Sequence, residues 1–346
     1  MLKRTSLIAI IILLSVCPFY APLTVSAQDE SFTVYFTEDM AFSTVLPDGW
    51  VADGNRDDGL TVANSADALG RALDEEGIFN PGDLALKVFA LPEDQLGGTP
   101  VDEFLALVAE QVVASTSDDP AEFSEVEELD FAGRAAVATV GSSSDVGAGL
   151  IMYPFAPQTY AVAVIAATPD ELEDQMETGL NALATVRYSL PLDATQDDEL
   201  VTFNYPDGWV LQVESPLYML ANDQAAFDAD DPGEGQYKIV LADLSAFEVD
   251  VATLSLADAT TTWVEGLLSE GQTASDPLTL TLDGVEVITE DVFNEDGDTV
   301  GGVFVVQFAS LENTVWGVAF GAAPGDSYQI SLTALNMLWG LQVAQQ

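Results

Sequence analysis

The chain lacks histidine altogether, and it contains one cysteine and only eight lysine and arginine residues. Without histidine, the commonest general base is missing, and so are the usual Ser-His-Asp and Cys-His catalytic arrangements. Imidazole metal ligands are missing too, so a zinc or copper site would depend on carboxylates. The single cysteine, Cys17, excludes a disulfide framework within the chain. These absences exclude several kinds of enzyme without indicating which function is present.

Negative charge dominates the composition. The 346 residues include 58 Asp and Glu, which gives a formal net charge of −50 at pH 7. Such a chain repels phosphate backbones and anionic lipid headgroups, which argues against nucleic acids and acidic membranes as partners. The acids are distributed along the chain, and Lys238 is the only cation after Asp197. This distribution is typical of a uniformly solvated surface rather than of an acidic interaction tail.

The N-terminus has the pattern of a signal peptide. Lys3 and Arg4 precede an uncharged apolar run over residues 7–16, which is too short to span a bilayer comfortably. Val25-Ser26-Ala27 supplies the small residues that a signal peptidase recognises. We therefore predict that residues 1–27 are removed and that a secreted, extracytoplasmic protein begins at Gln28.

Lipid anchoring at Cys17 is the alternative. Leu14-Ser15-Val16-Cys17 resembles a lipobox, in which the lipid is attached to the cysteine. A lipobox has Gly, Ala or Ser directly before the cysteine, and Val16 departs from that pattern, so cleavage after Ala27 is favoured. No later stretch approaches about 18 consecutive apolar residues, so we expect no transmembrane segment in the mature chain.

Internal repetition is the most informative feature of the sequence. The motif Pro47-Asp48-Gly49-Trp50 returns as Pro206-Asp207-Gly208-Trp209. Four further segments recur in the same order: residues 62–69 as 220–227, 81–88 as 232–239, 129–133 as 280–284, and 166–169 as 321–324. Five ordered matches, each about 150–160 residues apart, indicate a duplicated domain.

Each copy shows the same series of elements. Pro-Asp-Gly is typical of turns and its flanks are apolar or alternating, so we predict a β-hairpin whose second strand begins with the tryptophan. Apolar residues at helical spacing predict a middle helix near residues 101–112 and around Trp263, and a closing helix after Thr168 and around Leu332. Further strands are expected over residues 134–140, 148–155 and 160–166, and in the second copy over 285–293, 300–308 and 314–320.

These elements predict the fold class and the domain limits. Strands joined by short turns pair antiparallel, and helices with one apolar face must pack on the resulting sheet. The predicted class is α+β, a duplicated domain in which each copy is a largely antiparallel sheet flanked by helices. Residues 191–197 contain a proline and are mostly polar, so we place a linker there, between domains over 28–190 and 198–346.

The repeated pattern is similar to a known family. A hairpin bearing Tyr205-Pro206-Asp207-Gly208-Trp209, a middle amphipathic helix, a β-meander and a terminal helix resemble the PsbP-like α/β/α domains. These include an extrinsic photosystem protein and exported bacterial relatives. The resemblance covers most of both copies, although the first has Leu46 in place of the aromatic residue. It implies tandem PsbP-like sandwiches with a non-enzymatic binding or assembly role, and it carries over no functional residue.

Trp50 and Trp209 are the residues best suited to stacking on a ligand. A large aromatic that recurs at one fold position is more often a packed anchor, and we favour that interpretation. Acidic loops at residues 55–59, 228–231 and 294–298 could attract calcium. None has the spacing of an EF-hand loop, and Asp, Asn and Gly are ordinary turn residues, so we assign no metal ligand.

The remaining motifs indicate no catalytic site. Ser142-Ser143-Ser144-Asp145 has neither a histidine nor a nearby lysine to activate a serine, so we interpret it as a hairpin tip. Gly97-Gly98 and Gly301-Gly302 lack the lysine of a phosphate loop. Acids are abundant enough to supply the carboxylate pair of a glycoside hydrolase, but no pair stands out.

We therefore expect a secreted, non-catalytic binding or assembly module whose partner is a protein or a small ligand at the cell exterior. The alternatives are a carboxylate-dependent extracellular hydrolase and a surface protein that binds divalent cations such as calcium, weakly. No catalytic, cofactor-binding or metal-ligating residue is assigned, and no cofactor is expected.

Overall fold

A computed structural model describes residues 33–73, 78–115, 121–229, 231–247, 249–282, 284–308 and 314–343. The predicted signal peptide, its cleavage site and Cys17 lie outside these residues. The chain divides into two compact units, Met1–Tyr188 and Ser189–Gln346. Each unit is built on a large antiparallel sheet with helices, which confirms the predicted α+β class.

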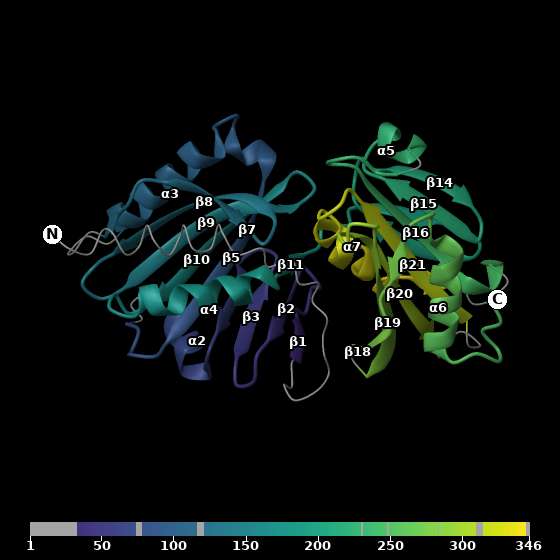
Figure 1. Cartoon of the computed structure of the whole chain (residues 1–346), viewed down its shortest axis with the longest axis horizontal. Helices are drawn as coiled ribbons and strands as arrows, with labels where there is room; N and C mark the ends of the chain where they lie inside the picture. The colour runs from purple at the N-terminus through teal and green to yellow at the C-terminus, as the bar shows by residue number, and fades with distance from the viewer. Residues whose placement is uncertain are drawn as a thin grey trace. The chain divides into compact units, whose positions relative to one another are not determined.

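The first unit has one large and one small sheet (Figure 1). Strand β7 pairs with β8 in the large sheet, whose order is β3-β4-β5-β10-β9-β8-β6, and the small sheet has the order β1-β2-β11. The elements are β1 (Thr33–Phe36), β2 (Phe42–Leu46), β3 (Val51–Asn55), β4 (Gly59–Ala63), α2 (Ala66–Leu73), β5 (Leu84–Pro92), the 3₁₀ turn η1 (Glu93–Leu96), α3 (Val101–Ser115), β6 (Glu122–Phe123), β7 (Glu127–Phe131), β8 (Arg134–Ser142), β9 (Gly147–Ala156), β10 (Thr159–Ala167), α4 (Leu172–Ala184) and β11 (Arg187–Tyr188).

Helices α3 and α4 cover opposite faces of this large sheet. Successive side chains of a strand point to opposite sides, so the contacts of β10 show which helix lies on which face. On β10, Val162 and Val164 pack with Leu105 of α3 in one apolar cluster. Ile165, one residue further along, lies on the other face beneath α4. A Cβ added to Gly179 of α4 would lie only 2.7 Å from Ile165 Cγ2, so a glycine permits this close approach.

Aromatic rings join the small sheet to the large one in the first unit. Phe42 on β2 and Tyr188 on β11 have ring centroids 5.2 Å apart, and Phe155 on β9 stacks on Tyr188 at 5.6 Å. Asp39, in the turn before β2, adds a polar connection by accepting the backbone N–H of Arg56 at 2.7 Å. The small sheet is therefore an integral layer of the unit.

The second unit repeats this strand order in both of its sheets, β14-β15-β16-β21-β20-β19-β17 with β18 on β19, and β12-β13-β22. The elements are β12 (Ala194–Asp197), β13 (Val201–Tyr205), β14 (Val210–Glu214), β15 (Leu217–Ala221), α5 (Gln224–Asp228), β16 (Tyr237–Asp243), η2 (Leu244–Phe247), α6 (Leu256–Leu267), β17 (Thr273–Ala274), β18 (Leu278–Leu282), β19 (Val285–Phe293), β20 (Thr299–Phe308), β21 (Thr314–Ala322), α7 (Tyr328–Trp339) and β22 (Gln342–Val343). Matching pairing in both units fits the predicted duplication.

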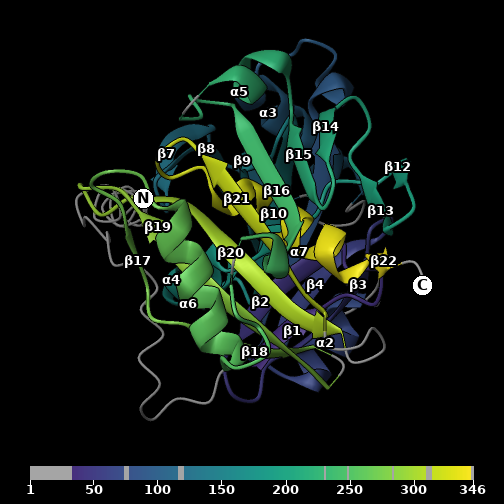
Figure 2. The same cartoon turned by 90° about the vertical axis from the view of Figure 1, so that its right-hand side faces the viewer.

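Helix α6 carries the largest buried side chain in the core of the second unit. It lies across β19 and β20 (Figure 2), and Trp263 on its inner face is 2% exposed. Val303 and Val305 of β20 belong to the same buried cluster. Gly317 of β21 leaves room for the indole, since a Cβ added there would lie 2.4 Å from Trp263 Cζ3.

The predicted hairpin at the Pro-Asp-Gly-Trp motif is wrong, although the turn itself forms. Trp50 N donates to the carbonyl oxygen of Pro47 at 3.1 Å, and Gly49 has a φ of 81°. The strand before the turn, β2, pairs with β1 and β11, whereas β3 pairs with β4. A positive φ confined to the third turn residue is the type II pattern, which splays the flanking strands. The motif therefore passes the chain from the small sheet to the large one in both units.

The segment expected as a linker differs from the prediction. Residues 194–197 form strand β12 of the second small sheet, where Ala194 pairs with Tyr205. Ser189 and Leu190, expected at the end of the first domain, bond to helix α7 of the second unit. Thr333 Oγ1 of that helix accepts the backbone N–H of Leu190 at 3.0 Å. Polar composition alone does not distinguish a linker from an edge strand of this kind.

Candidate functional site

The repeated tryptophans are less buried than a core anchor would be. Trp50 and Trp209 are both half-buried and directly precede β3 and β14. The fully buried indoles are those of Trp263 and Trp316, each 2% exposed. β2 and β3 belong to different sheets, so Trp50 follows a turn between two sheets rather than a hairpin turn. We therefore correct the anchor interpretation: Trp50 and Trp209 are partly exposed residues that each follow a turn.

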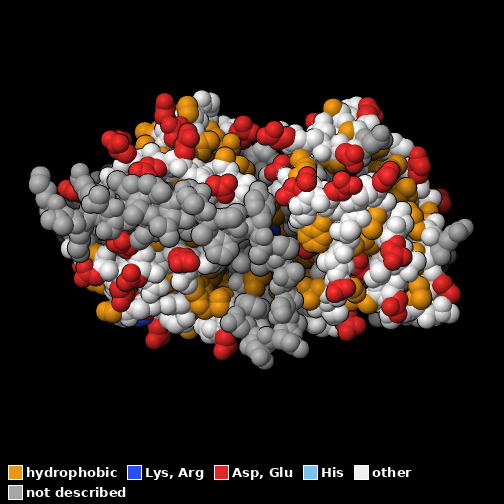
Figure 3. Space-filling model, viewed as in Figure 1, with side chains coloured by type: hydrophobic (Ala, Val, Ile, Leu, Met, Phe, Trp, Pro, Cys, Tyr) orange, Lys and Arg blue, Asp and Glu red, His pale blue; other side chains and the backbone are white. Residues whose placement is uncertain are grey.

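The acidic loops form self-contained turns. In the loops at 55–59 and 294–298, the side-chain oxygen of the first asparagine accepts two backbone amides, at 2.9 Å in both bonds of Asn55 and at 2.8 and 3.0 Å for Asn294. Asp230, in the third loop, lies outside the described residues. Within the described ranges, no group of three or more His, Cys, Asp or Glu is placed to hold a metal ion. Figure 3 shows acidic side chains scattered over the visible face.

The serine and glycine motifs also have structural explanations. Residues 142–145 lie at the β8–β9 turn, where Ser143 N donates to the carbonyl oxygen of Val146 at 2.9 Å. Gly301 and Gly302 are interior residues of β20, and a Cβ on Gly301 would lie 2.3 Å from the carbonyl oxygen of Phe320. These glycines permit close strand packing rather than phosphate binding.

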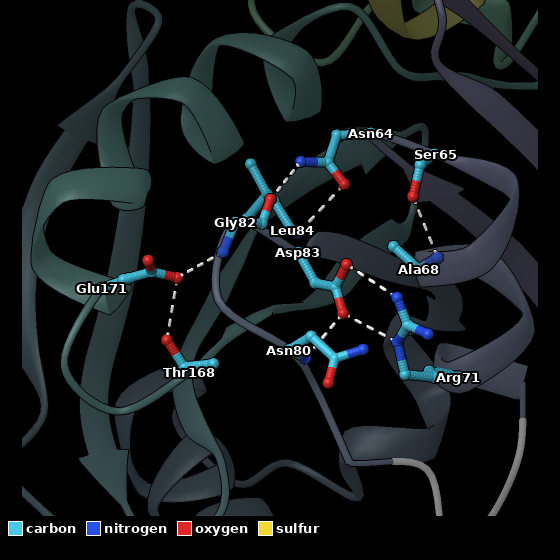
Figure 4. A network of polar contacts seen from close by, with 10 residues as sticks. All are labelled: Asn64, Ser65, Ala68, Arg71, Asn80, Gly82, Asp83, Leu84, Thr168 and Glu171. Carbon is cyan, nitrogen blue, oxygen red and sulfur yellow. Dashed lines mark hydrogen bonds and ion pairs between the residues drawn. The ribbon is translucent and has the colours of Figure 1, made fainter.

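A polar network joins α2, the β5 entry loop and the segment before α4 in the first unit (Figure 4). Arg71 donates two hydrogen bonds to the Asp83 carboxylate, at 2.7 and 2.8 Å, and Asn80 N donates a third at 2.6 Å. Although desolvation opposes it, these bonds hold the pKa of Asp83 below its ordinary value. Glu171 Oε2 accepts the backbone N–H of Gly82 at 2.7 Å.

The second unit has the same contact between an asparagine side chain and the backbone of this turn, which indicates a structural role for the network. Asn64 Nδ2 donates to Gly82 O at 2.7 Å, and Asn222 Nδ2 donates to Gly235 O at 2.8 Å. Both glycines have a positive φ, 88° and 71°. Gly82 therefore corresponds to Gly235, so the sequence match of residues 81–88 to 232–239 is wrong by two positions. The next residue, Asp83, corresponds to Gln236.

The first unit has a shallow groove of about 720 Å³. It lies where β5, η1 and the start of α3 meet the β9–β10 turn of the first unit. Its lining includes Pro92, Glu93, Asp94, Leu96, Pro100 and Tyr160. The groove is open to solvent and combines apolar walls with two carboxylates.

Two connections hold the groove in shape. Glu93 N donates to the carbonyl oxygen of Gln158 at 2.8 Å, which fixes η1 against the β9–β10 turn. Tyr160 packs against the cluster that contains Leu105 and Leu150, so its ring is supported from below. Burial, followed by the negative charge of Glu93, raises the pKa of Tyr160 above its ordinary value. The phenol and the carboxylate thus share one side of the groove.

The matching positions in the second unit are filled. Tyr160 and Val315 are each the second residue of equivalent strands, β10 and β21. Val315 is 2% exposed, whereas Tyr160 is half-buried. Trp263 lies over β21 there and packs against Leu244 and Val315 in the buried cluster. The two copies therefore differ at this strand position, which lines the groove in the first unit and is buried in the second.

A second unusual group is the buried carboxyl of Glu290 on β19, which is 1% exposed. Thr261 of α6 donates a hydrogen bond to its Oε1 at 2.6 Å, and its Oε2 has no hydrogen-bond partner within the described part of the chain. Burial raises the pKa of Glu290 above its ordinary value, and the nearby acids Glu265 and Asp276 act in the same direction. Its enclosure beneath α6 suits a structural role better than a catalytic one.

We expect Glu290→Gln to raise the free energy of unfolding by roughly 1–2 kcal/mol at neutral pH, because the amide needs no charge to be buried. The folded-state pKa is raised, so the wild type gains stability as pH falls towards the ordinary glutamate pKa of about 4.3. The advantage of the variant should therefore shrink on acidification. Urea unfolding at several pH values measures it, with exposed Glu286→Gln on the same strand as the control. A benefit that is independent of pH would contradict this prediction.

Comparisons with known proteins find matches among solved structures. No family model and no curated protein matches it. Among solved structures, it is similar to cyanobacterial PsbP (CyanoP) from Synechocystis, with 13% identity and a TM-score of 0.31 over 50% of this chain and 99% of that one. The Ran-binding protein Mog1p of Saccharomyces cerevisiae has 13% identity and a TM-score of 0.30, over 46% and 96%. The immunity protein TplEi of Pseudomonas aeruginosa has 11% identity and a TM-score of 0.22, over 90% and 97%.

No helix within the described ranges is long and apolar enough to cross a membrane. The groove residues Glu93 and Tyr160 and the buried Glu290 were all missed by sequence reasoning. No local signal marked Glu290, since strand β19 contains three acids, Glu286, Glu290 and Asp291. The matching strand β8 has Thr139 at the same distance from its starting turn.

Proposed function

We propose that the chain is a secreted, non-catalytic binding or assembly module of two PsbP-like repeats, and that the groove of the first unit is its contact surface. The single observation that supports this proposal is the contrast between the copies. One copy leaves Tyr160 accessible beside two acids, while the other buries the corresponding Val315. A recess that combines apolar walls with a few polar groups is the kind of feature that binding proteins use.

The geometry of the groove favours a protein segment over a small substrate. A small-molecule site encloses most of its ligand, whereas this recess is shallow and open along its length. Its floor belongs to a large sheet and its rim to a short 3₁₀ turn, both fixed by backbone hydrogen bonds. A rigid, preformed surface of this kind binds with little ordering cost.

The test is site-specific crosslinking in the native envelope. A photo-crosslinking amino acid at Thr99, inside the groove, should give a discrete adduct with one partner. The same amino acid at the exposed Glu127 on β7 serves as the matched control and should give none. Identical adduct patterns from both positions, or no adduct from Thr99, would contradict the proposed contact surface.

A further inference from the structure

We infer that the groove of the first unit binds an arginine side chain, presented by an extended segment of a partner protein. The inference rests on the proposed function and specifies the chemistry of the partner. It follows from the charge of the rim, the shape of the walls and an arrangement that the chain already uses for one of its own arginines.

Charge complementarity selects a cation. The groove lining contains Glu93 and Asp94, and it contains no lysine or arginine. The whole chain carries a formal charge of −50, so its field also attracts positive segments and repels negative ones. The two carboxylates are exposed, so their attraction should weaken as salt is added.

The walls favour arginine over lysine. Pro92, Pro100 and Tyr160 offer flat apolar surfaces along which the methylene stem of an arginine can lie. A guanidinium is planar, stacks on aromatic rings and pairs with carboxylates through two parallel hydrogen bonds. An ammonium group is a compact, strongly hydrated charge that makes less use of such walls.

The first unit already holds one of its own arginines against a tyrosine. The Arg56 guanidinium lies 5.2 Å from the ring centroid of Tyr188, and Arg56 Nη1 donates to the Tyr188 hydroxyl at 2.8 Å. The carboxylate of Asp39 accepts the backbone N–H of the same arginine. The groove offers a comparable tyrosine and acids, without an arginine of its own among the lining residues.

The experiment measures binding of a fluorescent, acetylated peptide with two arginines flanked by glycines, by anisotropy at low ionic strength. We expect binding to the full chain that is weaker for the lysine peptide and lost for the neutral citrulline peptide. The double variant Glu93→Gln/Asp94→Asn should bind the arginine peptide about tenfold more weakly. The double variant Glu127→Gln/Glu128→Gln removes the same charge from exposed positions on β7 and should bind as the wild type does.

Three outcomes would overturn the inference: equal binding of the citrulline peptide, equal loss in both double variants, or no binding of the arginine peptide. Equal loss would mean that general charge, rather than the groove, attracts the peptide. If the crosslink at Thr99 persists while the arginine peptide fails to bind, the contact surface stands and only the chemistry assigned to its partner is wrong.

Discussion

Trp263→Ala should lower the free energy of unfolding of the second unit by about 3–5 kcal/mol, the usual cost of truncating a large core aromatic. The indole is 2% exposed and packs with Leu244 and Val305. Its removal therefore leaves a cavity that the surrounding strands do not fill. Hydrogen exchange measured by mass spectrometry should show faster exchange in β20 and β21, with β9 and β10 of the first unit unchanged.

Two comparisons make this result specific to packing. Trp209→Ala, at a half-buried position in the same unit, should cost distinctly less. Gly317→Ala should destabilise the wild type, because the new Cβ would lie 2.4 Å from the indole, but should be better tolerated when Trp263 is replaced by leucine. Equal costs for Trp263→Ala and Trp209→Ala, or additive effects of the Gly317 pair, would contradict the proposed core.

The architecture was predictable because it depends on periodic and repeated signals. The apolar strands of each meander and the short turns between them require antiparallel neighbours, and β19 begins and ends at the predicted residues. The Pro-Asp-Gly-Trp motif was misread because a turn signal does not say whether the next strand returns to the same sheet. That choice depends on φ at Asp48, which would be positive in a type I′ hairpin turn and is not positive here, and on which apolar face each strand must cover.

The groove and the buried acid could not be predicted, because neither has a local pattern. Tyr160 lies in a strand whose alternation is normal, and its exposure follows from the side chains that α3 places opposite it. In the second unit, Trp263 on α6 packs in one cluster with the matching Val315, which lies 52 positions further along the chain (315 − 263). Glu290 likewise looks like an ordinary acid until α6 covers it.

Asp83 is the centre of the polar network of the first unit. Its side chain is 10% exposed and accepts three hydrogen bonds, two from Arg71 and one from the backbone of Asn80. The counterpart in the second unit, Gln236, accepts one, from the backbone N–H of Gly233 at 2.8 Å. Beside the asparagine contacts that both copies share, the turn is therefore held by an ion pair in the first copy and by one neutral side-chain hydrogen bond in the second.

Asp83→Ala should consequently lower the free energy of unfolding of the first unit by roughly 1.5–3 kcal/mol at neutral pH, since it removes the charge-assisted hydrogen bonds from Arg71 and from the backbone of Asn80. The pKa of Asp83 is held below its ordinary value, so the stabilisation is complete above the unfolded-state pKa of about 3.9 and is lost as pH falls through the lower folded value. The difference in unfolding free energy between wild type and variant should therefore be constant near neutrality and become smaller in acid.

Gln236→Ala, which removes one neutral hydrogen bond at the matching position, should cost less than about 1.5 kcal/mol and show no such decrease in acid. Urea unfolding across this pH range measures both differences, and hydrogen exchange in β4 and β5 is the local readout. A deficit of Asp83→Ala that persists unchanged in strong acid would show that the carboxylate charge contributes nothing to holding this turn.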